Sequence, residues 1–436
     1  MDDLTNMPSS SLIYDWNFHD GPPRAATACH VADETLRDGL QSPSVIDPPI
    51  EDKLRLLHLM VRLGIQCADI GLPGAGTRQY DDALRLAREI ASQRLPIVVY
   101  CAARTLRQDI EPICEVSQRA GIPIEVACFI GSSPIRQYAE GWTLDQLRRL
   151  TAEAVSFAVS QDMPVMYVTE DTTRSTPDAL RQLYTTAIEC GARRVCLSDT
   201  VGHATPEGAA ALVGFIRAVI AATGEDVRID WHGHRDRGLD IPNCFAAWAA
   251  GADRCHGTAL GIGERCGNTP IELLLVNLQL MGLAERDLTS LPEYTSLTSR
   301  ALGVPIPPNY PVVGADAFRT ATGVHAAAVI KAAHKGYTWL ADRIYSGVPA
   351  TSVGRRQEVE IGPMSGLSNV RYYLSVRGLP SDDRLCEDIL AAAKRSNHVL
   401  LEREVLSMVK RGHMVASMAH DKAKNKPVEQ RIDDRR

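Results

Sequence analysis

Two histidines separated by a single residue offer the clearest chemistry in the sequence. His232 and His234 lie in the segment WHGHRDRG, which ends a run typical of a β-strand. Because side chains alternate along a strand, both imidazoles are expected to point to one side, where they can bind one ion. Asp38, in the segment DETLRDGLQ, can supply a carboxylate oxygen. Two histidines and one carboxylate favour a divalent ion such as Mg²⁺, Mn²⁺, Co²⁺ or Zn²⁺, acting as a Lewis acid.

Eight β-rich runs would position these side chains. Segments with helical hydrophobic spacing separate them, for example residues 50–64, 176–191 and 205–224. Eight alternations of strand and helix predict an α/β fold, a (β/α)8 TIM barrel. An open doubly wound sheet is the alternative, but it would be expected to have a glycine-rich turn where this chain has ETLRDGLQS. The runs are residues 28–36, 66–73, 96–103, 123–133, 163–171, 193–200, 227–234 and 254–261.

Polar side chains stand at the end of nearly every predicted strand. In a parallel barrel these ends converge on one mouth, where the active sites of such barrels lie. One such residue alone would usually be a helix cap or a loop hydrogen-bonding group, but the same placement at seven or eight strands favours a functional mouth. The polar groups are Asp33 to Asp38, Asp69, Arg104, Ser132, Ser133, Glu170, Asp171, Asp199, Thr200, His232 and His234.

The composition argues against several other classes of function. The 436 residues contain 47 Lys and Arg against 53 Asp and Glu, a formal net charge of −6 without a basic stripe. Nucleic acid and anionic membranes are therefore not expected as partners. We find no signal peptide and no apolar stretch of about 18 residues, and we expect a cytoplasmic protein. The 11 cysteines form no CxxC pair, which favours reduced core thiols over disulfides.

The hydrophobic pattern changes after about residue 296. We expect an N-terminal extension (1–25), a catalytic barrel (26–295), a linker with a small, mainly helical cap (296–418) and a disordered charged tail (419–436). The linker contains GVPIPPNYPVVG, which is proline-rich and hence extended and semi-rigid. Such a linker can carry the cap away from its own barrel.

Five segments together resemble the motifs of a metal-dependent barrel superfamily. They are DETLRDGLQ, EDTTR, DTVGHATP, HGHRDRG and GIGERCGN, in this order between residues 33 and 268. The superfamily contains isopropylmalate, citramalate and homocitrate synthases and hydroxymethylglutaryl-CoA lyase. TGVHAAAVIKA (322–332), YSGVPATSVG and GPMSG (345–366) are similar to the cap of the synthases, which the lyases lack. The resemblance therefore favours a synthase.

The resemblance implies a Claisen-type condensation. A divalent metal holds a 2-oxo acid, acetyl-CoA loses a methyl proton, and the enolate attacks the ketone before the thioester is hydrolysed. It also implies a homodimer in which the cap covers the partner's barrel. The implied metal ligands are Asp38, His232, His234 and Asn268. The implied substrate-binding residues are Arg37, which would also stabilise the developing negative oxygen, Thr200 and Asp69. The implied catalytic residues are Arg37, the acid–base groups Glu170 and His325, and Tyr345 near the thioester.

Each of these roles has a structural alternative. Arg37 could be only a salt-bridge partner of Asp69, which stands where the family usually has a longer Glu. Thr200 could cap the following helix. Glu170 could serve only as a structural hydrogen-bonding residue. His325, within an alanine-rich segment, could be a surface or packing residue.

Arg136 bears on the identity of the 2-oxo acid. It lies in GSSPIRQYAEG (131–141), which resembles the segment with which homocitrate synthases bind the distal carboxylate of 2-oxoglutarate. A guanidinium fork fits a second anionic group, so we expect 2-oxoglutarate, oxaloacetate or phosphonopyruvate. The alternatives are an isopropylmalate synthase using 2-oxoisovalerate, a retro-aldol lyase that needs neither His325 nor Tyr345, and a non-catalytic metabolite-binding protein.

Overall fold

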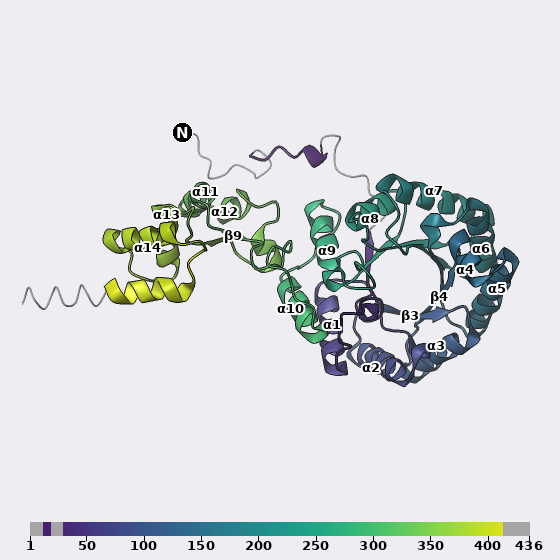
Figure 1. Cartoon of the computed structure of the whole chain (residues 1–436). Helices are drawn as coiled ribbons and strands as arrows, with labels where there is room; N and C mark the ends of the chain where they lie inside the picture. The colour runs from purple at the N-terminus through teal and green to yellow at the C-terminus, as the bar shows by residue number, and fades with distance from the viewer. Residues whose placement is uncertain (1–11, 19–28, 413–436) are drawn as a thin grey trace, which may run out of the picture. The chain divides into compact units, whose positions relative to one another are not determined.

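The computed structural model describes residues 12–18 and 29–412, which divide into two compact units between Ile306 and Pro307 (Figure 1). This division lies inside the proline-rich linker. The expected boundary after residue 295 falls within helix α10 (Leu291–Leu302), which packs against α1 (Ile50–Arg62) and so belongs to the first unit. The predicted disordered tail and most of the N-terminal extension lie outside the described residues.

The first unit is the predicted barrel of eight parallel strands. Each strand pairs with the next one, and β1 pairs with β8 to close the barrel. All eight strands lie within the runs expected from the sequence or extend them by one residue. They are β1 (His30–Asp33), β2 (Cys67–Asp69), β3 (Val98–Arg104), β4 (Glu125–Gly131), β5 (Val165–Glu170), β6 (Arg194–Asp199), β7 (Arg228–Gly233) and β8 (Arg254–Gly257).

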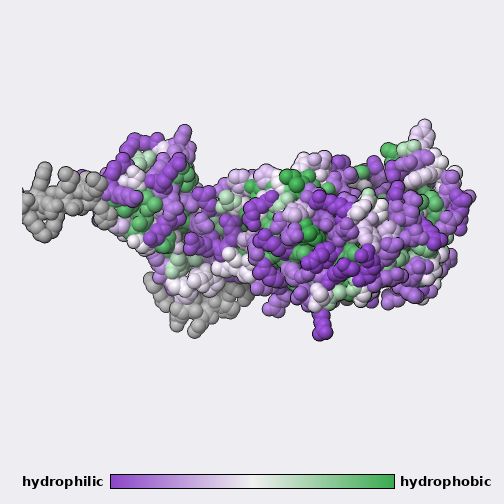
Figure 2. Space-filling model, turned by 90° about the horizontal axis from the view of Figure 1, so that it is seen from below, coloured by the Kyte–Doolittle hydropathy of each residue, from purple (hydrophilic) through white to green (hydrophobic). Residues whose placement is uncertain are grey.

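Helices surround the barrel (Figure 1). Several begin at a threonine whose hydroxyl accepts a hydrogen bond from the backbone N–H three residues later, as at Thr143, Thr176 and Thr205. Besides α1 and α10, they are α2 (Thr77–Gln93), α3 (Arg107–Ala120), α4 (Pro134–Glu140), α5 (Leu144–Ser160), α6 (Pro177–Glu189), α7 (Pro206–Thr223), α8 (Asp240–Ala249) and α9 (Ile271–Leu280). On the face shown in Figure 2, the barrel unit exposes mainly hydrophilic residues with hydrophobic ones scattered among them.

Helix α7 is the one described helix that is long and apolar enough, by length and composition alone, to cross a membrane. It nevertheless packs against α6 and α8 in the ring of barrel helices. Its side chains Val213, Ile216 and Val219 are buried there. About a quarter of this helix (28%) is buried in the described structure, so packing accounts for only part of its apolar character.

The barrel interior changes character along its axis. Together with the larger Tyr100 and Met166, the small side chains Ala32, Cys67, Ala127 and Cys196 form its central layer. Their small volume leaves space toward the carboxyl ends of the strands. All 11 cysteines are free and nine of them are buried, which confirms the expected core thiols.

The second unit is small and mainly helical, as predicted for the cap. Its core lies between α13 (Leu367–Val376), α14 (Asp383–Arg395) and a last helix over residues 402–412, and includes Tyr373, Leu374, Ile389 and Val405. Its elements are β9 (Arg319–Thr320), α11 (Gly323–His334), α12 (Thr338–Arg343), β10 (Glu358–Val359), α13 (Leu367–Val376) and α14 (Asp383–Arg395). The two short strands pair in parallel.

Candidate active site

A cavity of about 290 Å³ opens at the carboxyl ends of the barrel strands. Side chains from all eight strands or from the segments that follow them line it. Of the polar strand-end groups expected at one mouth, the lining includes Arg37, Asp38, Glu170, Thr200, His232 and His234 but not Asp69, Arg104, Ser132, Ser133, Asp171 or Asp199. Its lining comprises Glu34, Arg37, Asp38, Gln41, Leu72, Tyr100, Ala102, Ala127, Phe129, Met166, Val168, Glu170, Cys196, Ser198, Thr200, His232, His234, His256 and Glu264. A cavity of this size suits a small metabolite.

Asp38, His232 and His234 form a buried cluster at this cavity. One potential ligand atom from each residue lies within 4.8 Å of the other two, and His232 Nε2 is 3.7 Å from Asp38 Oδ2. Burial and the neighbouring His232 lower the pKa of His234 to about 4, which keeps its imidazole neutral. Burial opposes the ionised form of Asp38, but Arg37 and His232 outweigh it and lower the pKa of Asp38. A neutral imidazole and a carboxylate are the forms that bind metals.

Asn268 completes this cluster from the loop after β8. Its amide Nδ2 donates to Asp38 Oδ1 at 2.9 Å and to the carbonyl of Ile262 at 3.1 Å. Two buried polar atoms of the cluster, Asn268 Oδ1 and His234 Nδ1, have no hydrogen-bond partner in the described part of the chain. Since buried polar atoms are rarely left unpaired, this donor set fits a divalent ion.

Glycine is needed beside Asn268. Gly263 has a φ of +153°, and a Cβ built on it would overlap Asn268 Nδ2 and lie 3.2 Å from Asp38 Oδ1. The loop GIGERCGN can therefore approach the cluster closely because Gly263 has no side chain.

Arg37 is held by three carboxylates. Its guanidinium donates to Asp69 Oδ2 at 2.7 Å, to Asp38 Oδ2 at 3.0 Å and to Glu34 Oε1 at 3.0 Å. The salt bridge with Asp69 that the sequence left open is thus present, while Arg37 still lines the cavity. Asp69 itself is fully buried and absent from the lining, and burial, opposed by Arg37, raises its pKa to about 6. In this structure Asp69 contacts Arg37 rather than the cavity.

Glu170 and Thr200 line the cavity on the side of β5 and β6. Burial raises the pKa of Glu170, and the nearby Arg136 opposes this rise. The hydroxyl of Thr200 accepts a hydrogen bond from the backbone N–H of Asp171 at 2.8 Å, so it does not cap the following helix, whose cap is Thr205. In the described part of the chain, no acceptor is seen for the hydroxyl proton of Thr200, which lines the cavity.

Arg136 does not line the cavity, but it lies next to Glu170, which does. Its guanidinium is 3.6 Å from Glu170 Oε2, bonds to Glu140 at 2.8 Å and lies over the ring of Trp142. Its Nε is buried without a partner among the described residues. Gly131 leaves the space that this Nε occupies.

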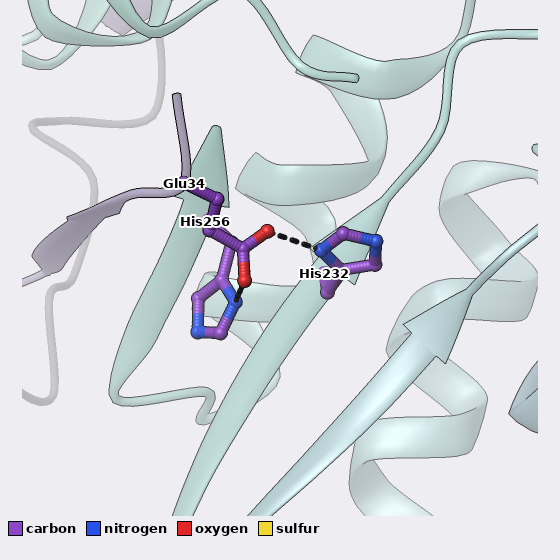
Figure 3. Close-up of side chains that lie close together, drawn as sticks. All are labelled: Glu34, His232 and His256. Carbon is purple, nitrogen blue, oxygen red and sulfur yellow. Dashed lines mark hydrogen bonds and ion pairs between the residues drawn. The ribbon is translucent and has the colours of Figure 1, made fainter. Parts of the chain in front are cut away.

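Two further residues of the site were not assigned a role from the sequence. Glu34 and His256 also line the cavity, and Figure 3 shows Glu34 between His232 and His256. Glu34 Oε2 is 2.6 Å from His232 Nδ1, and Glu34 Oε1 is 3.0 Å from His256 Nδ1. The alternation of charged residues within buried strands, as at Asp230 and His232 or Arg254 and His256, is the sequence signal that could have identified this network.

His325 and Tyr345 lie together in the second unit. His325 is in the first turn of α11, Tyr345 follows α12, and their rings stack with centroids 4.1 Å apart and an interplanar angle of 26°. The side chain of Tyr345 is 49% exposed. The structure therefore places the two expected cap residues side by side on the surface of that unit.

Comparisons with known proteins show which proteins this chain is similar to. The model of the HMGL-like family matches residues 28–297. The homocitrate synthase of Methanopyrus kandleri is 33% identical over 369 residues, which cover 84% of this chain and 86% of that protein. A probable 2-isopropylmalate synthase of Ignicoccus hospitalis is 31% identical over 368 residues, with the same coverage of 84% and 86%. The HMG-CoA lyase of Bacillus subtilis shares the fold, with a TM-score of 0.55, 20% identity and coverage of 65% of this chain and 96% of that one.

Proposed function

This chain belongs to the HMGL-like family, and from that premise we propose that it condenses acetyl-CoA with a 2-oxo acid in a divalent-metal-dependent reaction that releases CoA. The observation that carries the proposal is the buried cluster of Asp38, His232 and His234, which fits a metal next to the fixed guanidinium of Arg37. The relatives with about 30% identity are synthases that span most of this chain, which supports a condensing enzyme.

The metal would be held by Asp38, His232, His234 and Asn268. When bound, it supplies Lewis-acid polarisation of the ketone of the 2-oxo acid. Arg37 would donate to the oxygen that becomes negative as the ketone is attacked. Because Glu34, Asp38 and Asp69 fix its guanidinium beforehand, little reorganisation is needed when that charge develops.

The remaining chemistry requires substrate binding and proton transfer. Thr200 would donate its hydroxyl proton to the carboxylate of the 2-oxo acid. Glu170, whose pKa burial raises, is a candidate for proton exchange with the substrate. The stacked His325 and Tyr345 would act on acetyl-CoA and its thioester. We propose that they do so in a cytoplasmic homodimer, with the cap of one copy over the barrel of the other.

For the 2-oxo acid itself, we propose one with a second anionic group, such as 2-oxoglutarate, oxaloacetate or phosphonopyruvate. The buried, unpartnered Nε of Arg136 beside Glu170 supports this choice. A second candidate, 2-oxoisovalerate, is favoured by the apolar cavity wall of Ala102, Phe129 and Val168. Either acid would give a 2-substituted malate.

A thiol-release assay tests reaction class and substrate together. The metal-loaded protein is given acetyl-CoA with 2-oxoglutarate, oxaloacetate, phosphonopyruvate or 2-oxoisovalerate, and free CoA is measured. We expect release only with a 2-oxo acid present and at the highest kcat/KM with an anionic one. No release with any of the four acids, from a protein that binds Co²⁺, would refute the condensation.

A further inference from the structure

A column of alternating charges fills the barrel interior below the candidate metal cluster. His256 Nδ1 is 3.0 Å from Glu34 Oε1, His256 Nε2 is 2.9 Å from Asp230 Oδ2, and Arg254 Nε donates to Asp230 Oδ2 at 2.6 Å. Each of these four side chains is at most 4% exposed. Burying so many charges is costly unless every one is paired, and a fully paired buried network is rigid.

We propose that Glu34 is a positioning residue that fixes the tautomer and the orientation of His232, and that His256 and Asp230 hold Glu34 in place for this purpose. The inference rests on the proposed metal site at Asp38, His232 and His234. It concerns the residues behind the metal ligands and assigns them no contact with substrate.

The two oxygens of Glu34 have different partners. Oε1 accepts from three groups, namely Tyr100 at 2.8 Å, Arg37 at 3.0 Å and His256 at 3.0 Å. Among the described residues Oε2 is bonded to His232 Nδ1 alone, at 2.6 Å (Figure 3). Rotating the carboxylate would break the three bonds at Oε1, so Oε2 is held facing His232.

A carboxylate oxygen can only accept, so His232 Nδ1 must carry the proton. The lone pair of His232 is then on Nε2, the atom that lies 3.7 Å from Asp38. A carboxylate behind a histidine in this way fixes the ring and makes the other nitrogen a better ligand. His234 has no such support, because its Nδ1 is buried without a partner in the described part of the chain.

His256 holds Glu34 in position and is not itself a metal ligand. A carboxylate oxygen lies within 3.0 Å of each of its ring nitrogens, so both nitrogens are donors and neither has a free lone pair. Glu34, His232 and His256 have the spacing of a second metal group. Metal there would have to displace the bonds of Glu34 to both rings, and one ion per chain is therefore expected.

The test is Co²⁺ binding to the full-length protein, measured by equilibrium dialysis. Removing such a supporting group typically weakens metal binding about 10- to 100-fold, and we expect this for Glu34→Ala. Glu34→Gln should recover part of the loss, because an amide oxygen can still accept from His232 Nδ1. The matched control is Asp109→Asn, a buried carboxylate that bonds to Arg104 and is not in the cavity lining; it should bind Co²⁺ like the wild type.

A second measurement, proton NMR, detects the Nδ1 proton of His232 directly. In the Co²⁺-loaded protein, the Nδ1 proton of His232 should give a hyperfine-shifted proton NMR line that exchanges slowly with solvent. This line should vanish in His232→Asn, and move or exchange faster in Glu34→Gln. A purely structural role for Glu34 would leave it unchanged.

The outcomes separate this inference from the proposed function. If the wild type binds no Co²⁺, the proposed metal site fails and the inference fails with it. If Asp38→Ala weakens binding but folded Glu34→Ala and Glu34→Gln bind like the wild type with an unchanged NMR line, only the inference is overturned. Two Co²⁺ ions per chain would also overturn it, because His256 would then be a ligand.

Discussion

Asn268 donates its side-chain amide to Asp38 at 2.9 Å, although the two residues are 230 positions apart in the chain. The contact joins the loop after β8 to the turn after β1, where the barrel closes. It also leaves Asn268 Oδ1 buried and unpartnered among the described residues, beside Asp38. The closure of the barrel thus assembles the part of the candidate metal site that neither segment could form alone.

We expect activity to depend on a divalent ion. Chelator should abolish CoA release, and Mg²⁺, Mn²⁺ or Co²⁺ should restore it. Asp38→Ala or His232→Ala should weaken Co²⁺ binding by at least tenfold, since each removes one of the four proposed ligands. His58→Ala is the control, because this histidine lies on the surface of α1 and, among the described residues, pairs with Glu89. Full activity of His232→Ala/His234→Ala in chelator would contradict the assignment.

The loop at Gly263 gives a second prediction. Gly263→Ala places a methyl group against Asn268 Nδ2 and beside Asp38, so Asn268 must move away from the cluster. We expect weaker Co²⁺ binding and at least a tenfold lower kcat/KM with little change in secondary structure. Gly282→Ala is the matched control, since Gly282 has a φ of +68° but nothing within 4 Å of a built Cβ. Equal losses in both variants would point to backbone strain instead.

His256 predicts how stability changes with pH. Burial disfavours its charged form, but Glu34 and Asp230 outweigh burial and raise the pKa of His256 to about 9, above the ordinary value of 6.5. The stabilisation is therefore fully present below pH 6.5 and is lost as the pH rises through 9. The urea midpoint of the wild type should fall between pH 7 and pH 9.5 by more than that of His256→Gln. If the urea midpoints of the wild type and of His256→Gln change in the same way with pH, His256 is neutral in the folded protein.

The barrel could be predicted from the sequence because its signals are local. Eight β-rich runs alternating with amphipathic segments define the fold without any knowledge of register, and capping residues such as Thr176 and Gly224 mark helix ends. Strand period also indicated that His232 and His234 share a side. These features depend only on residues that are close together in the chain, so they can be recognised in the sequence alone.

The network beneath the cluster could not be predicted in this way. Glu34 meets His232 across 198 positions and His256 across 222, contacts that depend on strand register and barrel shear. Asp69 is a partial case, because its salt bridge with Arg37 was one of the alternatives left open by the sequence, whereas its full burial outside the cavity lining was not predicted. Such contacts depend on the direction in which each side chain points at the end of its strand. This direction cannot be read from the pattern of residue types.

The stacked pair in the second unit predicts a separation of activity from metal binding. General acid–base groups typically contribute about 10²- to 10⁴-fold, so His325→Ala should lower kcat by at least 100-fold and leave the Co²⁺ affinity unchanged. His334→Ala, at the other end of α11, is the matched control. An active His325→Ala/Tyr345→Ala variant would favour the lyase reaction, which needs neither residue.

Arg136 predicts which 2-oxo acid is used. If its guanidinium pairs with the distal anion of the substrate, Arg136→Ala should raise KM for the dianionic acid with little change for 2-oxoisovalerate. A charge-assisted contact is worth about 2–3 kcal/mol, or roughly 30- to 150-fold in kcat/KM. Arg136→Lys should recover only part of this, because a point charge cannot reproduce the two-pronged donor.

Two features of the site make the Arg136 test discriminating. Glu170, which lines the cavity, is 3.6 Å from the guanidinium of Arg136, so an anionic substrate must compete with this carboxylate for Arg136. Glu170→Gln removes the competing charge and should therefore tighten binding of the dianionic acid. The same variant should slow proton transfer. Arg148→Ala is the control, since Arg148 pairs with Asp145 on the surface of α5. If the wild type prefers 2-oxoisovalerate and Arg136→Ala is indifferent to substrate charge, the apolar wall selects the substrate, and the enzyme is an isopropylmalate synthase.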